Sequence, residues 1–344
     1  MKLLITTQAV DINHPILAFA IGWITEFSKH FAEVHVICLQ KGTYELPSNV
    51  FVYSLGKENG ESRLTYIVRF YRYFSYIFFK VKVEYVFFHM GAIYNILAFP
   101  FFIVRTFYKT SFFWWKAHGH INMVGKLALC FVDRVYTSTE SGFPINTSKR
   151  HVVGQAIDTF LFVPPSSEEM RTKEIIFVGR IMPVKHLEDF IDTAQILLEV
   201  DPTITFTIIG PNGDAVYYKK QVEKISSLGL TQNIIFAGSK TQEELVIVYQ
   251  HASVFLNTSR THSMDKTVLE ATLCGCIPVT SNKAFIDLLD EHGLYVENNS
   301  PDSYATVIKK LLAYSDSADL REQLQKAVIE KHSLATFSKR IFNV

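Results

Sequence analysis

Short apolar segments alternate with amphipathic segments along the second half of the chain. The segment 187–198 keeps the apolar period of a helix, and Thr241 and Glu244 form a Thr-x-x-Glu pattern that is typical of a helix N-terminus. Strand and helix patterns in alternation predict parallel strands joined by right-handed crossovers, with ligands at the carboxyl ends of the strands. The apolar runs that predict buried strands lie at 174–180, 204–210, 233–238, 252–259 and 276–281.

The first half of the chain has a similar but less regular alternation. Its strand patterns lie at 2–9, 33–40, 50–56, 83–90, 111–119 and 134–141, and its helix patterns lie near 15–31, 61–80, 92–108 and 121–131. We therefore expect a second doubly wound α/β domain in this half.

The alternation breaks near 153–174, where Pro, Ser and charged residues are typical of an interdomain linker. A chain of 344 residues is long enough for two domains. We place the boundary within 160–172 and expect an N-terminal domain at 1–165 and a C-terminal domain at 166–331.

The charge balance and the cysteines of the chain indicate which partners and which compartment to expect. The 34 Lys and Arg nearly balance the 33 Asp and Glu, so the chain has no overall attraction for nucleic acid. The four cysteines lie in apolar segments without the spacing of zinc ligands or of a disulfide framework, which favours reduced thiols in a cytoplasmic protein. Residues 1–15 form a strand and loop pattern rather than a signal peptide.

Aromatic and basic residues are interleaved between residues 63 and 115. The uncharged stretch before Arg105 is too short to cross a bilayer, so we expect no transmembrane helix. Two interpretations of 63–82 remain open. It forms either a helix in the membrane interface, with its cations near anionic lipid headgroups, or a core helix whose cations reach out to water.

A lysine occupies the first turn of the helix expected near 265–274. The amino end of a helix carries the positive end of its dipole, so Lys266 is unfavourable there unless an anion binds. Arg180 and Lys185 follow the strand pattern at 174–180 and bring two more cations to the same edge of the sheet. Such a cluster suits a diphosphate, although a solvated Lys266 would cost only about a few tenths of a kcal/mol.

Four segments in order resemble the signatures of the GT-B, family 4 type (glycosyl transferases group 1) retaining glycosyltransferases. They are FVGRIMPVKHLEDFIDTAQILL, FTIIGPNGD, IIFAGSKTQEELVIVYQHASVFLNTS and DKTVLEATLCGCIPVTS. The resemblance covers 172–315 and extends to VVGQAIDTFLFVP, which is similar to the interdomain segment of the family. It implies two Rossmann-like domains facing across a cleft, with 332–344 crossing back onto the N-terminal domain.

The resemblance assigns residues to the donor, a nucleotide-diphosphate sugar of the UDP or GDP type. It implies that Arg180 and Lys185 hold the diphosphate and stabilise the leaving nucleotide. Glu270 matches the second glutamate of the Glu-x7-Glu motif and would accept hydrogen bonds from the ribose, while Gly238 and Ser239 would pass beneath the base. The other residues implied in donor binding are Gly210, Asp265, Lys266, Thr267 and Val268.

The chain departs from the family pattern at the first glutamate of this motif, where His262 stands instead. That glutamate lies close to the transferred sugar in the family, so the resemblance does not establish how this chain recognises the sugar. His262 could hydrogen-bond a sugar hydroxyl, and Asp265 could either cap the following helix or take the place of the missing carboxylate. We expect the capping role for Asp265.

The N-terminal domain supplies candidates for the sugar and the acceptor. His118 follows a strand pattern where family members often carry a histidine that faces the donor sugar, and His120 is the second candidate. In place of a glycine-rich turn after the first strand, the chain offers Asp11, Asn13 and His14, which we expect on the acceptor side.

The resemblance implies a hexosyltransferase that retains anomeric configuration and acts on a glycan or lipid-linked acceptor of polysaccharide biosynthesis. No Asp-x-Asp metal motif is present and the cations can neutralise the phosphates, so we expect neither a metal nor a cofactor. The expected location is cytoplasmic, with membrane-surface contact through 63–115. The alternatives are a nucleotide-sugar epimerase of the same fold and a non-catalytic protein that binds a nucleotide sugar or glycan.

Overall fold

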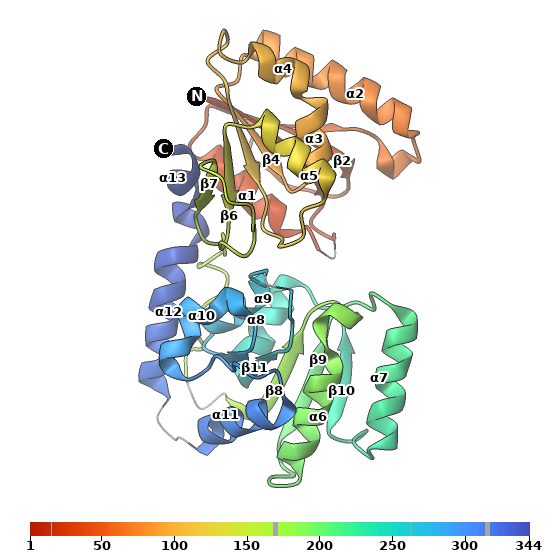
Figure 1. Ribbon diagram of the computed structural model, residues 1–344, viewed down its shortest axis with the longest axis vertical. Coiled ribbons are helices and arrows are strands. Elements are labelled where there is room, and N and C mark those ends of the chain that lie inside the picture. Colours follow the sequence, from red (N-terminus) through yellow and green to blue (C-terminus); the bar gives the residue numbers. More distant parts are fainter. Residues whose placement is uncertain (15, 168–170, 262, 314–316) are drawn as a thin grey trace. The chain divides into compact units, whose positions relative to one another are not determined.

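The structure is a computed structural model that describes residues 1–14, 16–167, 171–261, 263–313 and 317–344. It divides into two compact units (Figure 1). Unit 1 consists of Met1–Ala156 together with Leu334–Val344, and unit 2 consists of Ile157–Ser333.

Unit 1 contains a parallel sheet of seven strands in the order β3-β2-β1-β4-β5-β6-β7. The order reverses direction between β1 and β4, as in doubly wound folds. The strands are β1 (Lys2–Val10), β2 (Glu33–Lys41), β3 (Val50–Ser54), β4 (Tyr85–His89), β5 (Ser111–Trp115), β6 (Arg134–Thr137) and β7 (Arg150–Val152).

Helices cover both faces of this sheet, and each face has its own buried core (Figure 1). On one face Trp23 of α1 packs against Phe337 of α13; on the other, Phe74 of α2 packs against Phe101 of α4. The helical segments are α1 (Phe19–Ser28), η1 (Lys57–Asn59), α2 (Arg63–Tyr76), the π-helical turn η2 (Ile77–Val81), α3 (Ala92–Leu97), α4 (Phe99–Val104), α5 (Met123–Ala128), η3 (Leu129–Phe131), η8 (Leu334–Thr336) and α13 (Phe337–Phe342).

Unit 2 contains a parallel sheet of five strands in the order β10-β9-β8-β11-β12. The strands are β8 (Thr172–Val178), β9 (Thr205–Ile209), β10 (Ile234–Gly238), β11 (Ala252–Asn257) and β12 (Ile277–Thr280). The helical segments are η5 (Pro183–Lys185), α6 (Leu187–Leu198), α7 (Ala215–Ser227), α8 (Gln242–His251), α9 (Lys266–Leu273), η6 (Lys283–Phe285), α10 (Ile286–Leu289), η7 (Asp290–His292), α11 (Pro301–Ala313) and α12 (Ala318–His332).

The alternating pattern of the sequence therefore correctly predicts two parallel, doubly wound sheets. Two local differences have physical causes. The helix expected over 92–108 is two short helices, α3 and α4, because Pro100 in the first turn of α4 has no N–H to continue the preceding helix. The short strand β7 was not expected, since three residues carry too little pattern to identify.

The division between the units falls at 156/157 and 333/334, whereas the sequence suggested 165/166 and 331/332. Ile157 explains the first difference, because it is buried in the core of unit 2 and its backbone N–H donates to the His332 carbonyl. Within unit 1, the hydroxyl of Tyr136 donates to the Ile341 carbonyl at 2.7 Å, which attaches the C-terminal helix to the sheet.

Candidate functional site

The sheet of unit 2 changes direction between β8 and β11, which lie side by side in its centre (Figure 1). Segments leaving the carboxyl ends of two such strands run in opposite directions and leave a crevice between them, where doubly wound proteins bind ligands. Lys185 follows β8, and Ser259 and Asp265 follow β11. This edge is therefore the candidate site of unit 2.

An ion pair joins the two loops at this edge. The Lys185 Nζ atom lies 2.8 Å from Oδ1 and 2.9 Å from Oδ2 of Asp265. It also lies 3.4 Å from the Ser259 hydroxyl. The two charged side chains are only 14% and 18% exposed, so water screens their attraction less than it would at the surface.

A set of hydrogen bonds holds both partners of the pair in place. The Asn257 side-chain amide donates to Asp265 at 3.0 Å, and the Thr280 hydroxyl of the next strand donates to the side-chain Oδ1 of Asn257 at 3.0 Å. The Thr258 hydroxyl donates to the backbone carbonyl of Lys185 at 2.8 Å. The ends of three neighbouring strands thus fix the pair, which makes it a rigid part of the site.

The expectation that Asp265 caps the following helix is wrong. Asp265 occupies the N-cap position of α9, but its side chain accepts no hydrogen bond from the backbone of the helix. Its carboxylate instead accepts hydrogen bonds from Lys185 and Asn257. A charged partner binds a carboxylate more strongly than a neutral backbone N–H does, which explains the difference.

Lys266 begins α9, and Glu270 lies one turn later on the same helix. The Lys266 Nζ atom is buried, and Glu270 is 7% exposed. Burial lowers the pKa of Lys266 to about 7, while the charge of Glu270 opposes that shift. Burial likewise raises the pKa of Glu270 to about 7, opposed by the charge of Lys266 and by the Tyr249 hydroxyl. Each of these two buried groups therefore influences the charge of the other.

The two lysines at this edge are each associated with a carboxylate, and Arg180 after β8 is an exposed cation beside them. An anion that enters the site would meet Arg180, the Lys185 ammonium group and the amino end of α9, while the Nζ atom of Lys266 is buried. The two carboxylates would then repel it unless they turn to other partners, such as hydroxyl groups. The arrangement suits a ligand that carries both phosphates and hydroxyls.

Thr267 and Val268 have structural roles at the start of α9. The Thr267 hydroxyl donates to the Val178 carbonyl at 3.3 Å, which joins the helix to the end of β8. The Val268 side chain is fully buried in the core, so a ligand can meet only its backbone.

The glycines expected near the donor lie farther along the same edge. Gly210 follows β9, where its φ is +142° and an added Cβ would lie 2.0 Å from the Gly179 carbonyl oxygen. Gly238 ends β10, and both Gly238 and Ser239 are exposed. Because β9 separates β10 from β8, these two residues are not adjacent to the Lys185–Asp265 pair. His262, the remaining candidate in this domain, lies outside the described residues.

In unit 1, the predicted residues follow β1 and β5. His118 is exposed after β5, its backbone N–H donates to the Gly142 carbonyl, and its Nδ1 accepts from the backbone N–H of His120 at 3.2 Å. Asp11 and His14 accept hydrogen bonds from backbone N–H groups of their own loop, the former from Asn13 at 3.0 Å. Strand β4 lies between β1 and β5. The loop after β1 and the loop after β5 therefore lie at the same edge of the sheet but are not neighbours.

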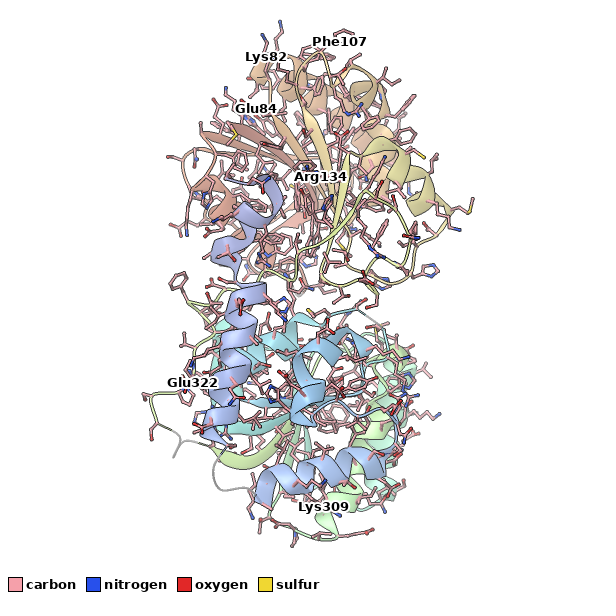
Figure 2. All side chains as sticks on the ribbon, turned by 60° about the vertical axis from the view of Figure 1, so that its left-hand side comes forward. Lys82, Glu84, Phe107, Arg134, Lys309 and Glu322 are labelled. Atoms are coloured by element: carbon pink, nitrogen blue, oxygen red, sulfur yellow. The ribbon has the colours of Figure 1, made fainter. Side chains whose placement is uncertain are left out.

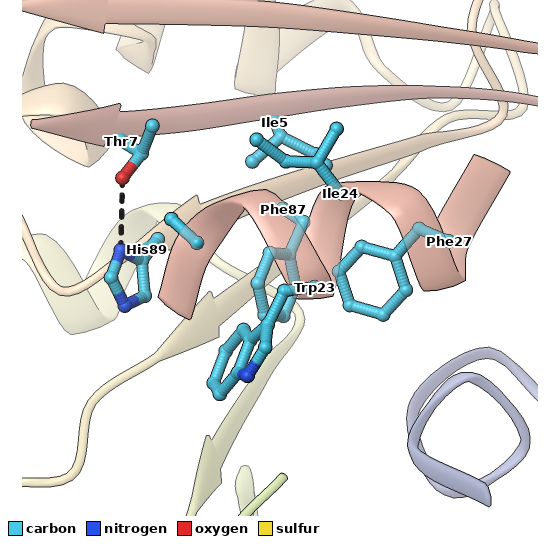
Figure 3. A pocket seen from close by; sticks show the side chains of 8 residues that line it. Ile5, Thr7, Trp23, Ile24, Phe27, Phe87 and His89 are labelled. Atoms are coloured by element: carbon cyan, nitrogen blue, oxygen red, sulfur yellow. Dashed lines mark hydrogen bonds between the residues drawn. The ribbon is translucent and has the colours of Figure 1, made fainter. Parts of the chain in front are cut away.

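Two buried residues at the direction change of the unit 1 sheet were not predicted from the sequence. Thr7 of β1 and His89 of β4 are buried there, with the Thr7 hydroxyl 3.0 Å from His89 Nδ1. They line a small, largely apolar hollow together with Trp23 and Phe87 (Figure 3). Their only signal in the sequence was a polar residue within each of two apolar strands, His89 being the last residue of β4.

Among the described residues, no group of three or more His, Cys, Asp or Glu side chains is arranged to hold a metal ion.

Sequence comparison matches residues 160–331 to the family model described as glycosyl transferases group 1. The D-inositol 3-phosphate glycosyltransferase of Corynebacterium diphtheriae is 29% identical over 167 residues, which are 47% of this chain and 38% of that protein. The enzyme of the same name from Rhodococcus jostii is 27% identical over 150 residues, 42% of this chain and 33% of that protein. The matches thus span little more than a third of the length of these relatives.

Comparison of structures matches the whole chain. Anabaena Alr3699/HepE in complex with UDP has a TM-score of 0.78 at 15% identity, covering 100% of this chain and 99% of that chain. The sucrose-phosphate synthase of Thermosynechococcus elongatus has a TM-score of 0.79 at 13% identity, covering 100% and 98%. At this identity the likeness concerns the fold, and it confirms the expected GT-B fold with its two parallel-sheet domains.

Proposed function

The chain belongs to the glycosyl transferases group 1 family, and on that basis we propose that it is a retaining hexosyltransferase that uses a nucleotide-diphosphate sugar. The observation that carries the proposal is the cluster of Arg180, Lys185 and Lys266 at the carboxyl edge of the unit 2 sheet. Three cations beside a helix N-terminus match the charge of a diphosphate.

The donor is a UDP-sugar or a GDP-sugar. UDP is the better supported, because similar structures contain UDP, UDP with glucose, or UDP-glucose. Arg180, Lys185 and Lys266 bind the diphosphate, and Glu270 accepts hydrogen bonds from the ribose hydroxyls. Gly238 and Ser239 meet the base through their backbone.

In the transfer reaction the bond between the sugar C1 and the phosphate oxygen breaks, and a bond from the acceptor oxygen to C1 forms on the same face. The acceptor proton passes to an oxygen of the departing phosphate. The cations stabilise the negative charge that develops on the leaving nucleotide, so the chemistry needs neither a metal nor a further cofactor. Asp265, held beside Lys185, takes the place of the missing glutamate near the sugar.

The acceptor is a glycan or a lipid-linked glycan of polysaccharide biosynthesis, handled in the cytoplasm at the membrane surface. His118 meets the donor sugar, and Asp11, Asn13 and His14 meet acceptor hydroxyl groups. Histidine, asparagine and carboxylate side chains are suited to hydrogen-bonding sugar hydroxyls.

A second candidate is a non-catalytic protein that binds a nucleotide sugar. It is favoured by the ion pair of Lys185 with Asp265 and by the burial of the Lys266 Nζ atom, which leave Arg180 as the exposed cation of the cluster. An epimerase of the same fold is the third, and it would convert the donor without any acceptor.

Donor hydrolysis and transfer, measured with a panel of UDP-sugars and GDP-sugars, distinguish these functions. The proposal predicts slow hydrolysis of one donor and transfer to a glycan acceptor with the anomeric configuration retained, as nuclear magnetic resonance would record. Nucleotide binding without hydrolysis or transfer would support the binding protein. Loss of transfer in EDTA, restored by Mg²⁺ or Mn²⁺, would contradict the metal-independent chemistry.

A further inference from the structure

Positive charge is concentrated in one part of unit 1. Between Ser62 and Val132 the chain carries nine Lys or Arg and one acidic residue, Glu84. The other 273 residues carry 25 Lys or Arg and 32 Asp or Glu, so the near-zero net charge conceals a strong local excess. Glu84 accepts a hydrogen bond from the backbone N–H of Lys2 at 2.6 Å, at the opposite end of the strands from the candidate ligand edge.

The outer side of α2 combines this charge with exposed apolar side chains. Leu64, Val68, Arg72 and Tyr76 recur every four residues and therefore form one ridge along the helix, and all four are exposed. The opposite side of α2 is buried through Phe70 and Phe74. The helix is thus apolar toward its core and also carries exposed apolar side chains, with one arginine among them, on its outer side.

The exposed surface continues from α2 through η2 to α4 and the turn that follows it. Phe79 of η2 contacts Phe101 of α4 and Tyr108 of the turn. Between the two segments, the Thr110 hydroxyl donates to the Val83 carbonyl at 2.8 Å. Side chains from segments far apart in the sequence therefore lie on one continuous surface.

Phe107 is the most exposed large apolar side chain of the described residues, at 86%. Figure 2 shows it in the same part of unit 1 as Lys82. Lys80, Lys82 and Lys109 are exposed in the segments next to it. We call this surface the aromatic–basic face and define it by Val68, Arg72, Phe79, Lys82, Ile103 and Phe107.

We propose that the aromatic–basic face binds the surface of a bilayer that contains anionic phospholipids. Exposed aromatic and aliphatic side chains enter the boundary between headgroups and acyl chains, and the interleaved lysines and arginines attract the anionic headgroups. Arg69 and Arg105 are paired with Glu61 and Asp133, so the attraction comes mainly from the exposed Arg72, Lys80, Lys82 and Lys109. In the described residues no helix is long and apolar enough to cross a membrane, so this contact lies at the surface.

This inference builds on the proposed function, since a transferase with a lipid-linked acceptor meets its substrate at a membrane. Its test is co-sedimentation with vesicles of phosphatidylcholine alone and of phosphatidylcholine mixed with phosphatidylglycerol, without nucleotide. The protein should bind the mixed vesicles and bind the neutral ones weakly, and added salt should weaken the binding. Equal binding to both vesicles, or binding to neither, would overturn the proposal.

Two pairs of variants locate the contact. The double variant Lys80→Glu and Lys82→Glu should lower the partition coefficient between vesicles and water by roughly 25-fold. This figure counts only the headgroup attraction that is lost with each lysine. Lys309→Glu combined with Lys310→Glu, two exposed lysines of unit 2, should leave it unchanged. Equal losses in the two pairs would mean general charge attraction rather than a specific face.

A third comparison tests the apolar part of the face. Phe107→Ser should lower vesicle binding by about tenfold, whereas Phe160→Ser, which removes a similarly exposed ring from unit 2, should not.

Sedimentation velocity without vesicles measures the oligomeric state. A dimer that dissociates in Phe107→Ser would show that a second copy covers the face, which would contradict the proposal. UDP affinity measured without vesicles tests the proposed function separately.

Discussion

The Nζ atom of Lys185 lies 2.8 Å from Oδ1 of Asp265, and this pair joins the loops that follow the two central strands of unit 2. The lysine that the family resemblance assigns to the donor diphosphate is therefore held by a carboxylate of its own chain. A diphosphate that binds Lys185 must compete with Asp265. The strength of this ion pair therefore affects the affinity for the donor.

Asp265→Asn should affect stability, UDP affinity and sugar transfer in different ways. Removing one partner leaves a largely buried ammonium group, so the free energy of unfolding should fall by about 2 kcal/mol. UDP affinity should rise several-fold because the competing carboxylate is gone, while transfer should fall because the proposed contact with the sugar is lost. Urea unfolding, calorimetry with UDP and a transfer assay measure the three effects.

Glu223→Gln is the matched control for that substitution. Glu223 pairs with Lys219 on α7, where both side chains are well exposed, and surface pairs contribute about 0.5 kcal/mol or less. Its unfolding free energy and UDP affinity should both stay near those of the parent. A smaller loss of stability for Asp265→Asn than for this control would contradict the structural role of the pair.

Donor binding should depend on pH through the Lys266–Glu270 pair. The lowered pKa of Lys266, about 7, means that the free protein loses this proton as the pH rises through that value. A bound diphosphate favours the protonated lysine, so binding takes up a proton and affinity falls above about pH 7, by up to about tenfold per pH unit. Glu270 gains its negative charge over the same range; its repulsion of the diphosphate acts in the same direction, whereas its proposed hydrogen bonds from the ribose act in the opposite one.

Calorimetry of UDP-sugar binding in buffers of different ionisation enthalpy measures this proton uptake directly. A nucleotide sugar is the suitable ligand because its esterified diphosphate does not titrate near neutral pH. Lys266→Met should bind the donor more weakly and lose most of the pH dependence. An unchanged dependence in that variant would assign the titration to another group.

Gly210 and Gly238 should differ sharply in their tolerance of alanine. A Cβ at Gly210 would lie 2.0 Å from the Gly179 carbonyl oxygen, so Gly210→Ala should lower the free energy of unfolding by about 3 kcal/mol or more. Gly238 also has a positive φ, but no atom lies within 4 Å of an added Cβ, and Gly238→Ala should cost only about 1 kcal/mol. Equal costs, measured by urea unfolding, would contradict the close contact of the two loops.

His118→Ala should lower transfer without changing UDP affinity. His118 belongs to unit 1, whereas every residue proposed to bind the nucleotide belongs to unit 2. A lost hydrogen bond to the sugar should reduce kcat/KM by about tenfold to a hundredfold. His120→Ala, two residues away, is the control and should leave both quantities near those of the parent. If His120→Ala lowered transfer and His118→Ala did not, His120 would be the residue that contacts the sugar.

The architecture was accessible from the sequence because it depends on periodicity. The apolar runs before Arg180 and before Thr258 are long enough to identify as buried strands, and their order with the helices determines a parallel sheet. Position within the sheet was not accessible, since no local pattern shows that β8 and β11 are neighbours. The resemblance to a known family supplied that information indirectly.

The partners of the charged side chains could not be predicted for the same reason. Asp265 precedes a helix, and capping was the reasonable local interpretation. Its actual partner, Lys185, lies 80 residues earlier in the chain and reaches it only after both strands are in place. Thr7 and His89 are likewise 82 residues apart, so their contact had no signal beyond two polar positions in apolar strands.

Calorimetric titration with UDP tests the central claim most directly. The protein should bind UDP, and Lys185→Ala and Lys266→Ala should each weaken that binding by about tenfold to a hundredfold, as expected for the loss of a charged hydrogen bond. Lys219→Ala, on the exposed surface of α7, should bind as the parent does. If the parent bound neither UDP nor GDP, or if the three variants bound equally well, the cation cluster would not be a nucleotide diphosphate site.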